Sequence, residues 1–501
     1  MSGKVWLVGA GPGKKDLLTL RGKEILEQAD VVVYDALVGK ELLGLIPESA
    51  RRIYAGKRSG NHALKQEETN RILLEEAQKG NRVVRLKGGD PFLFGRGGEE
   101  LELLEEHGIP FEVVPGVTSA FSVPAYCGIP VTHRDYCSSV HVITGHKRQG
   151  QDYGIDFRAL AETRGTLIFL MGIESLPVIC QGLLTAGMGP STPAAVLEKG
   201  TTARQRRISS DLMHLQETCR ERKVQTPAII VVGQVCTLAE RFAWYEKKPL
   251  AGVRAVVTRP RELSSRLSEM LREEGAEVWE IPAIRLVPDP EAVRQAFQEL
   301  EQGSVDWIVF TSPSGVRIFM DQLLQERDIR ILAGAKIAVI GTGSEKELRA
   351  YGLKADFVPS VYDGATLGRE LAEKLQEGAH VLIPRAAIGN RELTEELGRI
   401  PKVCITEIAA YDTLYEASPV YDLKELILQE EFDYAVFTSA STVRGFAAAA
   451  RGADLKKVQA ICIGPQTAAA AKELGMRIRV AAKATLPDLV ECVKKAKEEG
   501  R

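Results

Sequence analysis

Pairs of glycines flank Asp90 and Pro91 in the stretch "VRLKGGDPFLFGRGGEE" at residues 84–100. Glycine weakens helices and strands by roughly 0.5–1 kcal/mol per residue, so glycines this dense indicate either sharp turns or a ligand that lies against the main chain. Asp90 followed by Pro91 predicts the start of a helix, because Asp is a favoured N-cap and Pro a favoured first residue. That interpretation leaves Gly88 and Gly89 unexplained, which favours a ligand contact at this turn.

Two other apolar runs in the first half of the chain end in polar residues. "VGAGPGKKDLLTL" (8–20) has the look of a dinucleotide-binding turn, but Lys14 stands where that fingerprint needs a third small residue. Asp35 closes the run "VVVYD", and ligands of open α/β sheets lie beyond the carboxyl ends of strands. Asp35 is therefore a candidate for chemistry, with an N-cap or turn residue as the alternative. Lys57, in "YAGKRSGNH", is either a second candidate or a solvated surface lysine.

A further turn of this kind lies in "VVPGVTSAFSVPAYCGIPVTHRDY" (113–136), where a proline–glycine pair is followed by Thr118 and Ser119. Several such turns at strand ends would line a pocket with main-chain amides and hydroxyls. A pocket of that kind suits a polar cofactor that must be kept away from water.

The second half repeats a simpler pattern, in which apolar runs end in Ser, Thr, Gly or Arg with no nucleophile–base pair or metal cluster. "WIVFTSPSGVRIF" (307–319) matches "YAVFTSASTVRGF" (434–446), and other pairs keep an offset of about 125 residues, the size of one α/β domain. We therefore expect two similar lobes. Hydroxyls and helix N-termini beyond parallel strands hold anions well, although each Ser or Thr is an ordinary N-cap in the alternative interpretation.

An α/β scaffold is needed to position these residues, and the rest of the sequence predicts one. Apolar runs such as "NRVVRL" (81–86) and "PAIIVVG" (227–233) alternate with helical patterns, which indicates largely parallel sheets. A charged, proline-containing joint within "RFAWYEKKPLAGVRAVVTRP" (241–260) places a domain boundary near residue 248.

Length and composition limit the classes of function. A chain of 501 residues suits two to four domains, and a net charge of −2 indicates no general affinity for nucleic acid or acidic membranes. No apolar run is long enough to span a membrane, and the N-terminus has no signal-peptide pattern. The 8 cysteines and 7 histidines show neither C-x-x-C nor H-E-x-x-H spacing, so we expect free thiols, no metal site and a cytoplasmic protein.

The motifs of the first half occur in the order and spacing of a known family. "GAGPGKKDLLTL", "KGGDPFLFGRGGEE", "VPGVTSAFSVPAYCGIPVTHRDY", "FLMG" and "EKGTTARQR" together resemble the tetrapyrrole methylases over about residues 3–243, and most of all the uroporphyrinogen-III C-methyltransferases. The resemblance implies S-adenosylmethionine bound in a cleft between two α/β subdomains, and a homodimer formed through this half.

The same resemblance implies roles for individual residues. Asp35 and Lys57 become the pair that handles the proton released after methylation, and Arg134, Lys57 and Arg58 become cations for the eight carboxylates of the macrocycle. Leu93 and Ser119 stand where relatives often have another aliphatic residue and Ala. The implied contacts of the cofactor are Pro12, Gly88, Gly89, Asp90, Leu93, Thr118, Ser119, Met171 and Gly200.

The second half resembles the uroporphyrinogen-III synthases over about residues 250–501, through its "RP", "FTS", "IG" and "YxT" landmarks in order. That resemblance implies closure of linear hydroxymethylbilane with inversion of its last ring. It places Tyr411 in the cleft, where its hydroxyl assists the loss of water, with a strand-edge packing residue as the alternative. Ser312, Ser344, Ser439 and Thr467 would hold substrate carboxylates.

The two resemblances together predict a bifunctional enzyme of two α/β parts: a two-subdomain methylase fold followed by a two-lobed parallel-sheet synthase fold. The expected domains are 1–243 and 251–501, joined by a linker at 244–250. One synthase lobe would hold 251–284 and 412–501, and the other 285–411. The second half would make uroporphyrinogen III, and the first would methylate it twice to precorrin-2.

Two alternatives remain open on the sequence. The first half could methylate a later corrin intermediate, and the second half could be a two-lobed regulatory module that binds a small molecule. We also expect no dehydrogenase or iron-inserting activity, because no segment of the sequence matches such a module.

Overall fold

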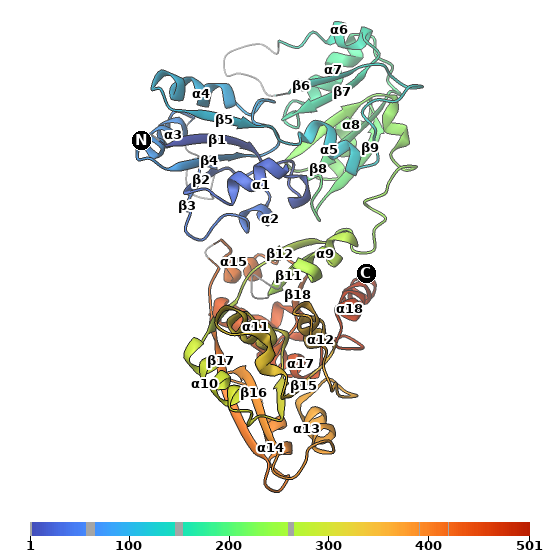
Figure 1. Cartoon of the computed structure of the whole chain (residues 1–501). Helices are drawn as coiled ribbons and strands as arrows, with labels where there is room; N and C mark the ends of the chain where they lie inside the picture. The colour runs from blue at the N-terminus through green and yellow to red at the C-terminus, as the bar shows by residue number, and fades with distance from the viewer. Residues whose placement is uncertain are drawn as a thin grey trace.

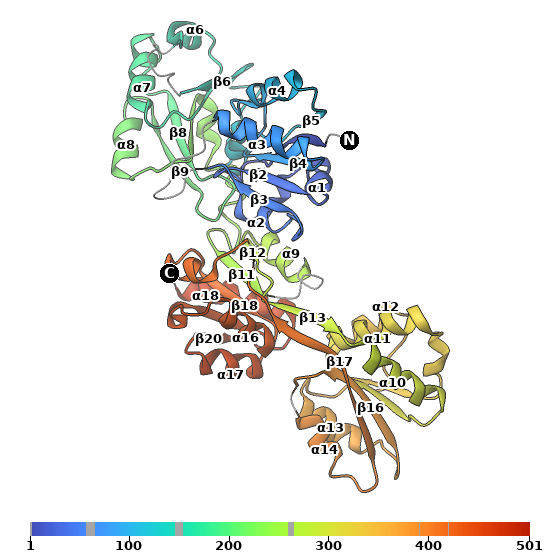
Figure 2. The same ribbon diagram turned by 90° about the vertical axis from the view of Figure 1, so that its left-hand side faces the viewer.

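The computed structural model describes residues 3–56, 66–145, 154–258, 265–389, 391–418 and 420–500. In these residues the strands form four sheets, two in each half of the chain (Figures 1 and 2). No helix in this described part combines the length and apolar character that crossing a bilayer requires. The expected α/β fold class, two paired α/β units in succession, is confirmed.

The first sheet has the order β3-β2-β4-β1-β5, and each of these neighbouring strand pairs is parallel. Alternate residues of the strands face two apolar layers, one with α1 and α2 and the other with α3 and α4. Because the strands run in one direction, the turns that follow them lie along one edge of the sheet. The elements are β1 (Lys4–Gly9), η1 (Lys15–Leu17), α1 (Leu20–Leu26), β2 (Val31–Tyr34), α2 (Lys40–Leu43), β3 (Arg51–Tyr54), α3 (Gln66–Gln78), β4 (Arg82–Lys87), α4 (Gly97–Glu106) and β5 (Phe111–Val114).

The second sheet, with the order β6-β7-β10-β8-β9, departs from the expected parallel arrangement. Among its described pairs β6 and β7 are parallel, whereas β10 is antiparallel to both β7 and β8. The run "PAIIVVG" is buried on both sides, and such a run does not reveal strand direction. The elements are α5 (Ser119–Tyr126), β6 (Val140–Thr144), α6 (Phe157–Glu162), β7 (Thr166–Leu170), α7 (Leu176–Thr185), β8 (Pro193–Glu198), β9 (Arg206–Asp211), α8 (Leu215–Glu221), β10 (Ala228–Val232) and η2 (Gln234–Leu238).

The third sheet has the order β12-β11-β18-β19-β20 and parallel pairing. It combines strands from the start and the end of the second half of the chain, so the chain leaves this lobe and returns to it. The elements are β11 (Arg254–Thr258), α9 (Ser265–Glu273), β12 (Glu277–Glu280), α15 (Leu423–Leu428), β18 (Tyr434–Phe437), α16 (Ala440–Ala449), η5 (Leu455–Lys457), β19 (Gln459–Cys462), α17 (Pro465–Glu473), β20 (Arg477–Val480) and α18 (Leu486–Glu499).

The fourth sheet has the order β13-β17-β16-β14-β15, in which β13 is antiparallel to β17. These two strands run side by side at the junction of the lobes (Figure 2). The elements are β13 (Ile284–Pro288), α10 (Pro290–Glu301), β14 (Trp307–Phe310), α11 (Pro313–Glu326), η4 (Ile329–Leu332), β15 (Lys336–Val339), α12 (Thr342–Ala350), α13 (Gly364–Ala372), β16 (His380–Ala386), α14 (Glu392–Leu397) and β17 (Cys404–Tyr415).

The repeated "FTS" runs form the same strand–cap–helix unit in both lobes. Ser312 is the N-cap of α11, and its hydroxyl accepts a hydrogen bond from the Gly315 N–H. Ser439 is the N-cap of α16, and its hydroxyl accepts one from the Thr442 N–H. A Ser N-cap satisfies one of the free amides of the first helical turn. The N-cap interpretation of these serines therefore describes their local structure.

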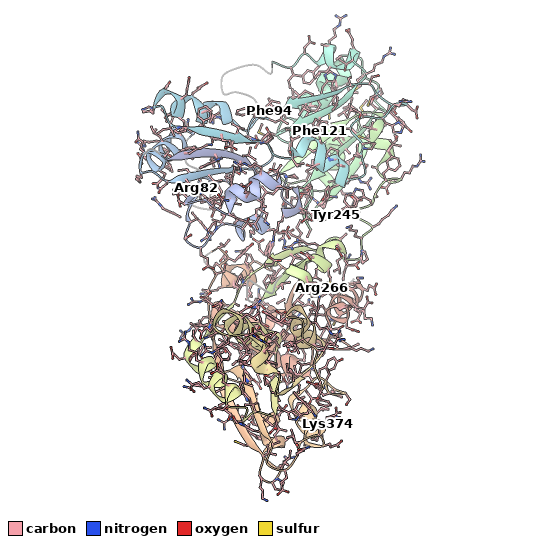
Figure 3. All side chains as sticks on the ribbon, in the orientation of Figure 1. Arg82, Phe94, Phe121, Tyr245, Arg266 and Lys374 are labelled. Atoms are coloured by element: carbon pink, nitrogen blue, oxygen red, sulfur yellow. The ribbon has the colours of Figure 1, made fainter. Side chains whose placement is uncertain are left out.

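Aromatic side chains connect the two halves of the chain. Tyr245, labelled in Figure 3, is a buried residue, and its ring centroid lies 4.9 Å from that of Tyr126 at the end of α5. Trp244 packs on the same ring and donates a hydrogen bond from Nε1 to the Ala125 carbonyl, 2.9 Å away. Beyond this segment α2 of the first half lies against β12 of the second.

Candidate functional site

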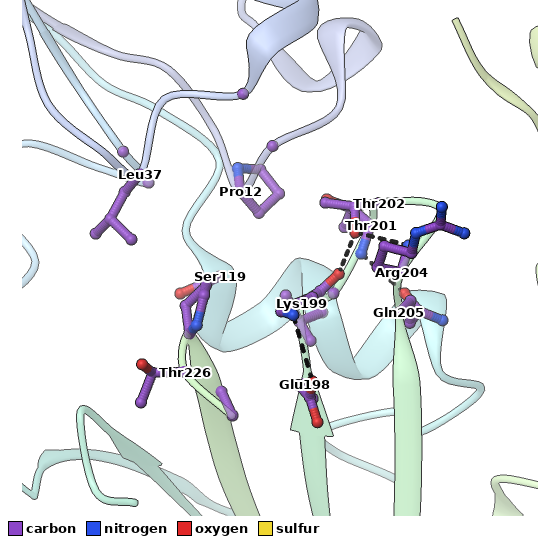
Figure 4. A pocket seen from close by; sticks show the side chains of 18 of the residues that line it. Pro12, Leu37, Ser119, Glu198, Lys199, Thr201, Thr202, Arg204, Gln205 and Thr226 are labelled. Atoms are coloured by element: carbon purple, nitrogen blue, oxygen red, sulfur yellow. Dashed lines mark hydrogen bonds and ion pairs between the residues drawn. The ribbon is translucent and has the colours of Figure 1, made fainter. Parts of the chain in front are cut away.

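A cavity of about 1510 Å³ opens where the carboxyl edge of the first sheet faces the second sheet. The turns after β1, β2 and β4 form one wall, and the start of α5 with the segments after β7 and β8 forms the other. Residues of the second half of the chain, among them Arg254, Glu277 and Trp279, also line the cavity. Figure 4 shows Pro12 and Leu37 on the first wall, and Ser119, Lys199 and Thr226 on the second. The tertiary structure thus brings together turns that are far apart in the sequence.

The glycine turns pack against each other at this edge. Gly11 and Gly89 exchange main-chain hydrogen bonds of 3.2 and 2.7 Å, and both adopt a positive φ, +73° and +70°. A Cβ atom on Gly116 would lie 2.2 Å from the Gly89 carbonyl oxygen and 2.6 Å from the Gly9 Cα. Close approach of the main chains therefore explains part of the glycine requirement. Gly89 lines the cavity, and a Cβ atom on it would have no other atom within 4 Å.

Asp90 holds two of these turns together. Its Oδ1 accepts hydrogen bonds from the N–H groups of Phe92 and Leu93, at 2.9 and 3.2 Å, and its Oδ2 accepts one from Gly116 at 2.9 Å. The helix predicted to start at Asp90 is wrong in position, because the chain forms a turn here and α4 begins at Gly97. The carboxylate caps free amides as an N-cap would, but the glycines that follow let the chain turn away first.

Asp35 lies directly after β2 and lines the cavity. Its Oδ1 accepts a hydrogen bond of 3.0 Å from the Leu37 N–H, and its Oδ2 lies 3.2 Å from an Arg85 guanidinium nitrogen. The side chain of Asp35 is 23% exposed, against 7% for that of Arg85. Asp35 is thus a turn residue and also a carboxylate held toward the cavity by a buried cation.

Behind Asp35 lies a buried ionic cluster. One oxygen of Glu100 lies 3.1 Å from the Arg85 Nε and 2.8 Å from the Lys87 ammonium, and the side chain of Glu100 is fully buried. Burial lowers the pKa of Lys87, the neighbouring charge of Arg85 lowers it further, and Glu100 acts in the opposite direction. Arg85 and Lys87 both line the cavity, so the cluster supplies fixed positive charge to its wall.

The opposite wall carries the remaining residues of the expected cofactor site. Thr118 caps α5 through the Ala120 N–H, and Ser119 is the first residue of that helix. Met171 follows β7 with a φ of +53° and is 52% exposed. Gly200 packs so closely on α5 that a Cβ would lie 2.2 Å from a methyl of Val123. These residues and Leu93 all line the cavity.

The cavity offers what S-adenosylmethionine requires of a binding site. The open face of Gly89 admits a ligand to the main chain, and the buried Thr201 hydroxyl has no hydrogen-bond partner among the described residues. Thr201 is 2% exposed and lines the cavity (Figure 4). Buried hydroxyls are normally hydrogen-bonded, so this one is suited to a ligand atom. In the described part of the chain no group of His, Cys, Asp and Glu is arranged to hold a metal ion.

Two of the expected site residues are not placed at this cavity by the described residues. Lys57 lies outside the described residues. Arg134 is exposed on the loop that follows α5 and is not among the residues that line the cavity. The structure therefore gives Arg134 no contact with the positions around Asp35.

In the second half, Tyr411 and Ser312 meet beside the N-terminus of α11. Their hydroxyls share a hydrogen bond of 3.0 Å, although they are 99 residues apart in the sequence. Tyr411 is 6% exposed and packs in the core of its lobe. Burial raises its pKa, while the hydrogen bond with Ser312 and the charge of Arg385 act in the opposite direction.

The other expected anion-binding residues stand at strand ends of both lobes. Ser344 lies in the first turn of α12, after β15, with a buried hydroxyl that has no hydrogen-bond partner among the described residues. Ser439 caps α16, after β18, and Thr467 is buried in the first turn of α17, after β19. These positions face the carboxyl ends of parallel strands on two separate sheets.

Sequence reasoning missed Arg85, Lys87 and Arg385. Each cation lies in or at the end of an apolar strand, and their residues are 4–8% exposed. Charged side chains are rarely buried unless they are paired, so a cation inside an otherwise apolar run is the signal that could have found them. Arg385 pairs with Glu407 at 2.8 Å and lines a cavity of about 650 Å³ beyond β16.

Comparison with known proteins assigns both halves to families. The family model of tetrapyrrole (corrin/porphyrin) methylases matches residues 4–216, and that of uroporphyrinogen-III synthase HemD matches residues 265–491. The porphyrin biosynthesis protein HemD of Ruminiclostridium josui is 46% identical over 492 residues, which cover 98% of this chain and 97% of that protein. The synthase match does not favour a regulatory module as the second half.

Other relatives match the first half alone. The siroheme synthase of Pseudomonas paraeruginosa is 49% identical over 245 residues, and the match covers 49% of this chain and 52% of that enzyme. This chain thus spans about half the length of that siroheme synthase. The crystal structure of the uroporphyrin-III C-methyl transferase of Thermus thermophilus with S-adenyl homocysteine has 41% sequence identity and a TM-score of 0.40, covering 47% of this chain and 99% of that one.

The full-length match and the two domain matches agree in order and extent with the two paired α/β units of the structure. The chain therefore belongs to the family of the Ruminiclostridium josui porphyrin biosynthesis protein, and in this chain a tetrapyrrole methylase domain precedes a uroporphyrinogen-III synthase domain.

Proposed function

We propose that the first half transfers two methyl groups from S-adenosylmethionine to uroporphyrinogen III, giving precorrin-2. The second half makes that substrate by closing hydroxymethylbilane with inversion of its last ring. The methyl-transfer function is supported best by one observation: the glycine turns, the buried cation Arg85 and the carboxylate of Asp35 all line the same cavity.

Main-chain groups and small polar side chains would hold the cofactor. When bound, S-adenosylmethionine supplies a methyl group already activated by a sulfonium. The protein aligns donor and acceptor and excludes water, and alignment is worth roughly 7–11 kcal/mol of the barrier. The residues proposed to contact the cofactor are Pro12, Gly88, Gly89, Asp90, Leu93, Thr118, Ser119, Met171 and Gly200.

Asp35 is proposed to accept the proton that the methylated ring must lose. A ring carbon forms the new bond to the methyl group, and the sulfur–methyl bond breaks. The ring is then positively charged until a proton leaves it. Arg85 holds the Asp35 carboxylate at 3.2 Å and toward the cavity, so the base is positioned before the reaction starts. Lys57 remains proposed as its partner.

Cations around the cavity fit a substrate with many carboxylates. Arginines in particular bind carboxylates through paired hydrogen bonds. Arg134 stays a proposed substrate contact, and it would need to reach the macrocycle from outside the cavity wall. The cations that line the cavity include Arg96, Lys199, Arg204, Arg206, Arg222 and Lys223.

In the synthase half, Tyr411 is proposed to assist the loss of hydroxide from hydroxymethylbilane. Its hydroxyl is held by Ser312 at the N-terminus of α11, where the helix dipole favours negative charge. Ser312, Ser344, Ser439 and Thr467 are proposed to hold carboxylates on the two lobes. The buried Ser344 hydroxyl, which has no hydrogen-bond partner in the part of the chain that the structure describes, supports this role best.

The domain division, the oligomeric state and the compartment complete the proposal. Domains at 1–243 and 251–501 are supported by the sheets, none of which combines strands from both. The proposed lobe bounds at 284 and 412 fall at the start of β13 and within β17, the two strands at the junction of the lobes. A homodimer through the methylase half is supported by the exposed aromatic residues Phe92, Phe94 and Phe121. The 8 free cysteines support the cytoplasm as the compartment.

One anaerobic experiment tests both activities. The full chain is incubated with hydroxymethylbilane and isotope-labelled S-adenosylmethionine, and the macrocycle is analysed by mass spectrometry. We expect a cyclic product that carries two labelled methyl groups. A cyclic product without label would contradict the methylase assignment, and labelled methyl groups only after uroporphyrinogen III is supplied would contradict the synthase assignment.

A further inference from the structure

A buried carboxylate on α2 contacts both halves of the enzyme. Glu41, on α2, is 6% exposed. Its Oε2 accepts a hydrogen bond of 3.2 Å from the Lys15 N–H, within its own half. Its Oε1 accepts bonds from the Val278 N–H and from the Arg272 Nε of the synthase half, at 2.8 and 3.1 Å.

Neighbouring contacts surround this carboxylate. The Tyr421 hydroxyl donates to the Lys40 carbonyl at 2.6 Å, and the Lys40 ammonium lies 3.0 Å from Glu431. The Arg272 guanidinium also pairs with Glu280 at 3.2 Å. Figure 1 shows α2 directly above β12 and α9, the elements that carry the synthase side of this contact.

The docked segments are the ones that form the methyl-transfer cavity. Lys15 follows the turn that contains Pro12, and Glu41 follows Asp35 by six positions on the segment Asp35–Glu41 that lines the cavity. On the opposite wall, the Ala203 N–H donates to Glu277 of the synthase half at 2.9 Å, three residues after Gly200. The synthase half thus contacts both walls of the cavity, and some of its own residues, among them Arg254, Glu277 and Trp279, also line it.

Close packing transmits a shift of α2 to the glycine turns. A Cβ on Gly39 would lie 1.9 Å from the Gly13 carbonyl oxygen, and a Cβ on Gly88 would lie 2.4 Å from the Leu37 Cβ. The segment before α2 therefore touches both the first and the second glycine turn. It cannot move without moving them or opening a gap, because protein interiors have few voids.

Loss of one partner would destabilise this docking strongly. Burial raises the pKa of Glu41, and the charge of Arg272 and the Val278 amide oppose that rise. A buried carboxylate is tolerated only while its charge is paired and hydrogen-bonded. Without Arg272 the carboxylate would have to take up a proton or reach water, and both weaken the contact.

We propose that the synthase half is a structural part of the methyl-transfer site, a role that rests on the methyl-transfer function proposed above. Its docking at Glu41 holds the first glycine turn and the Asp35 segment in the arrangement that binds the cofactor. Arg272 and Tyr421 are positioning residues, since they act on the cavity through Glu41 and Lys40. By linkage, the bound cofactor tightens the docking of the two halves to the same extent.

The test uses the full chain and titration calorimetry with S-adenosylhomocysteine as the probe. Arg272→Met is expected to weaken its binding about 10-fold, within the usual range of coupling between sites. Arg272→Lys keeps the charge and should restore part of the affinity. Arg294→Met removes an arginine of α10 that pairs with Glu326 of α11, in the other lobe of the synthase half, and should bind like the wild type.

Two further measurements separate docking from folding. Cyclisation of hydroxymethylbilane should keep its wild-type rate in these variants, and amide exchange at Lys15 and Val278 should become faster in Arg272→Met. Tyr421→Phe, which keeps the aromatic volume, should weaken probe binding in the same direction if Arg272→Met does not fold. Faster exchange at both amides together with wild-type probe affinity would overturn the proposal. A wild-type chain that does not bind the probe would overturn the methyl-transfer function instead.

Discussion

Asp35 contacts Arg85 through one carboxylate oxygen and the Leu37 N–H through the other. Asp35→Ala removes the proposed proton acceptor, so the methyl-transfer rate should fall by roughly 10²–10⁴-fold. Binding of S-adenosylhomocysteine should change little, because the proposed cofactor contacts are elsewhere. Single-turnover methylation and probe titration measure the two effects, and unchanged methylation would exclude Asp35 as the base.

Tyr411 is the corresponding test in the synthase half. Burial raises its pKa, so the hydroxyl stays neutral to a higher pH than an exposed tyrosine and remains able to donate a hydrogen bond. Tyr411→Phe should slow cyclisation. In the wild type, the rate of cyclisation should show no decline from ionisation of this tyrosine at pH values up to 10.0, the ordinary pKa of a tyrosine.

Tyr415→Phe is the matched control, since Tyr415 lies on the same strand, β17, and is 51% exposed. It should cyclise hydroxymethylbilane like the wild type over the whole pH range. Equal rates for both variants would show that Tyr411 only fills space in the core.

At the scale of elements, the turn after β5 depends on a glycine. In Gly116→Ala the new methyl would meet main-chain atoms of Gly89 and Gly9 within 3 Å, so one of the turns has to shift. We expect a loss of about 1–3 kcal/mol of stability, as for other overpacked sites, and weaker S-adenosylhomocysteine binding. Denaturant unfolding and calorimetry measure both.

Gly98→Ala is the control for this substitution. Gly98 lies in α4, and a Cβ there would have no atom within 4 Å. Alanine stabilises a helix relative to glycine by up to about 1 kcal/mol. A Gly116→Ala chain as stable as Gly98→Ala would contradict the packing of the three turns.

A pH-dependent contact fastens α3 to the first sheet. Glu76 binds Lys79, Arg51 and Asn81 at 2.7, 3.0 and 3.0 Å, and these contacts, the Lys79 bond first, lower its pKa. Such a carboxylate stabilises the fold above its unfolded pKa near 4.5, and this stability disappears as the pH falls through the lower folded value.

Glu76→Gln should therefore cost about 1 kcal/mol near neutral pH, and the difference from the wild type should vanish well below about pH 4. Denaturant unfolding at several pH values measures it. Glu75→Gln on the same helix loses an exposed pair and should be near neutral throughout. A cost of Glu76→Gln that does not change with pH would contradict the ionic origin of the contact.

At the scale of the whole molecule, the methylase half is expected to form the homodimer. Light scattering of the full chain should give twice the mass of one chain, independent of concentration in the micromolar range. Cross-linking followed by mass spectrometry should place the contacts within residues 1–243. A monomer, or cross-links confined to the synthase half, would contradict this arrangement.

The amino-acid sequence alone determined the class of fold and the position of most turns around the cavity. Apolar runs followed by glycine mark the ends of β1 and β4, and Ser312 and Ser439 mark helix starts, because these preferences depend on neighbouring residues. The helix start predicted at Asp90 and Pro91 was misplaced, because the glycines that follow favour a turn over a helix. The direction of β10 also escaped prediction, since a fully buried strand has the same pattern in either direction.

Only the tertiary structure decided which charges meet. Arg85 reaches Asp35 across 50 positions and Glu41 reaches Arg272 across 231, and no local pattern encodes such a pair. A buried charge is stable only beside its partner, and the partner is supplied by the packing of separate strands and separate halves. The sequence therefore determined where the glycine turns and hydroxyl groups lie. The tertiary structure decided which carboxylate faces the cavity and which carboxylate contacts both halves of the chain.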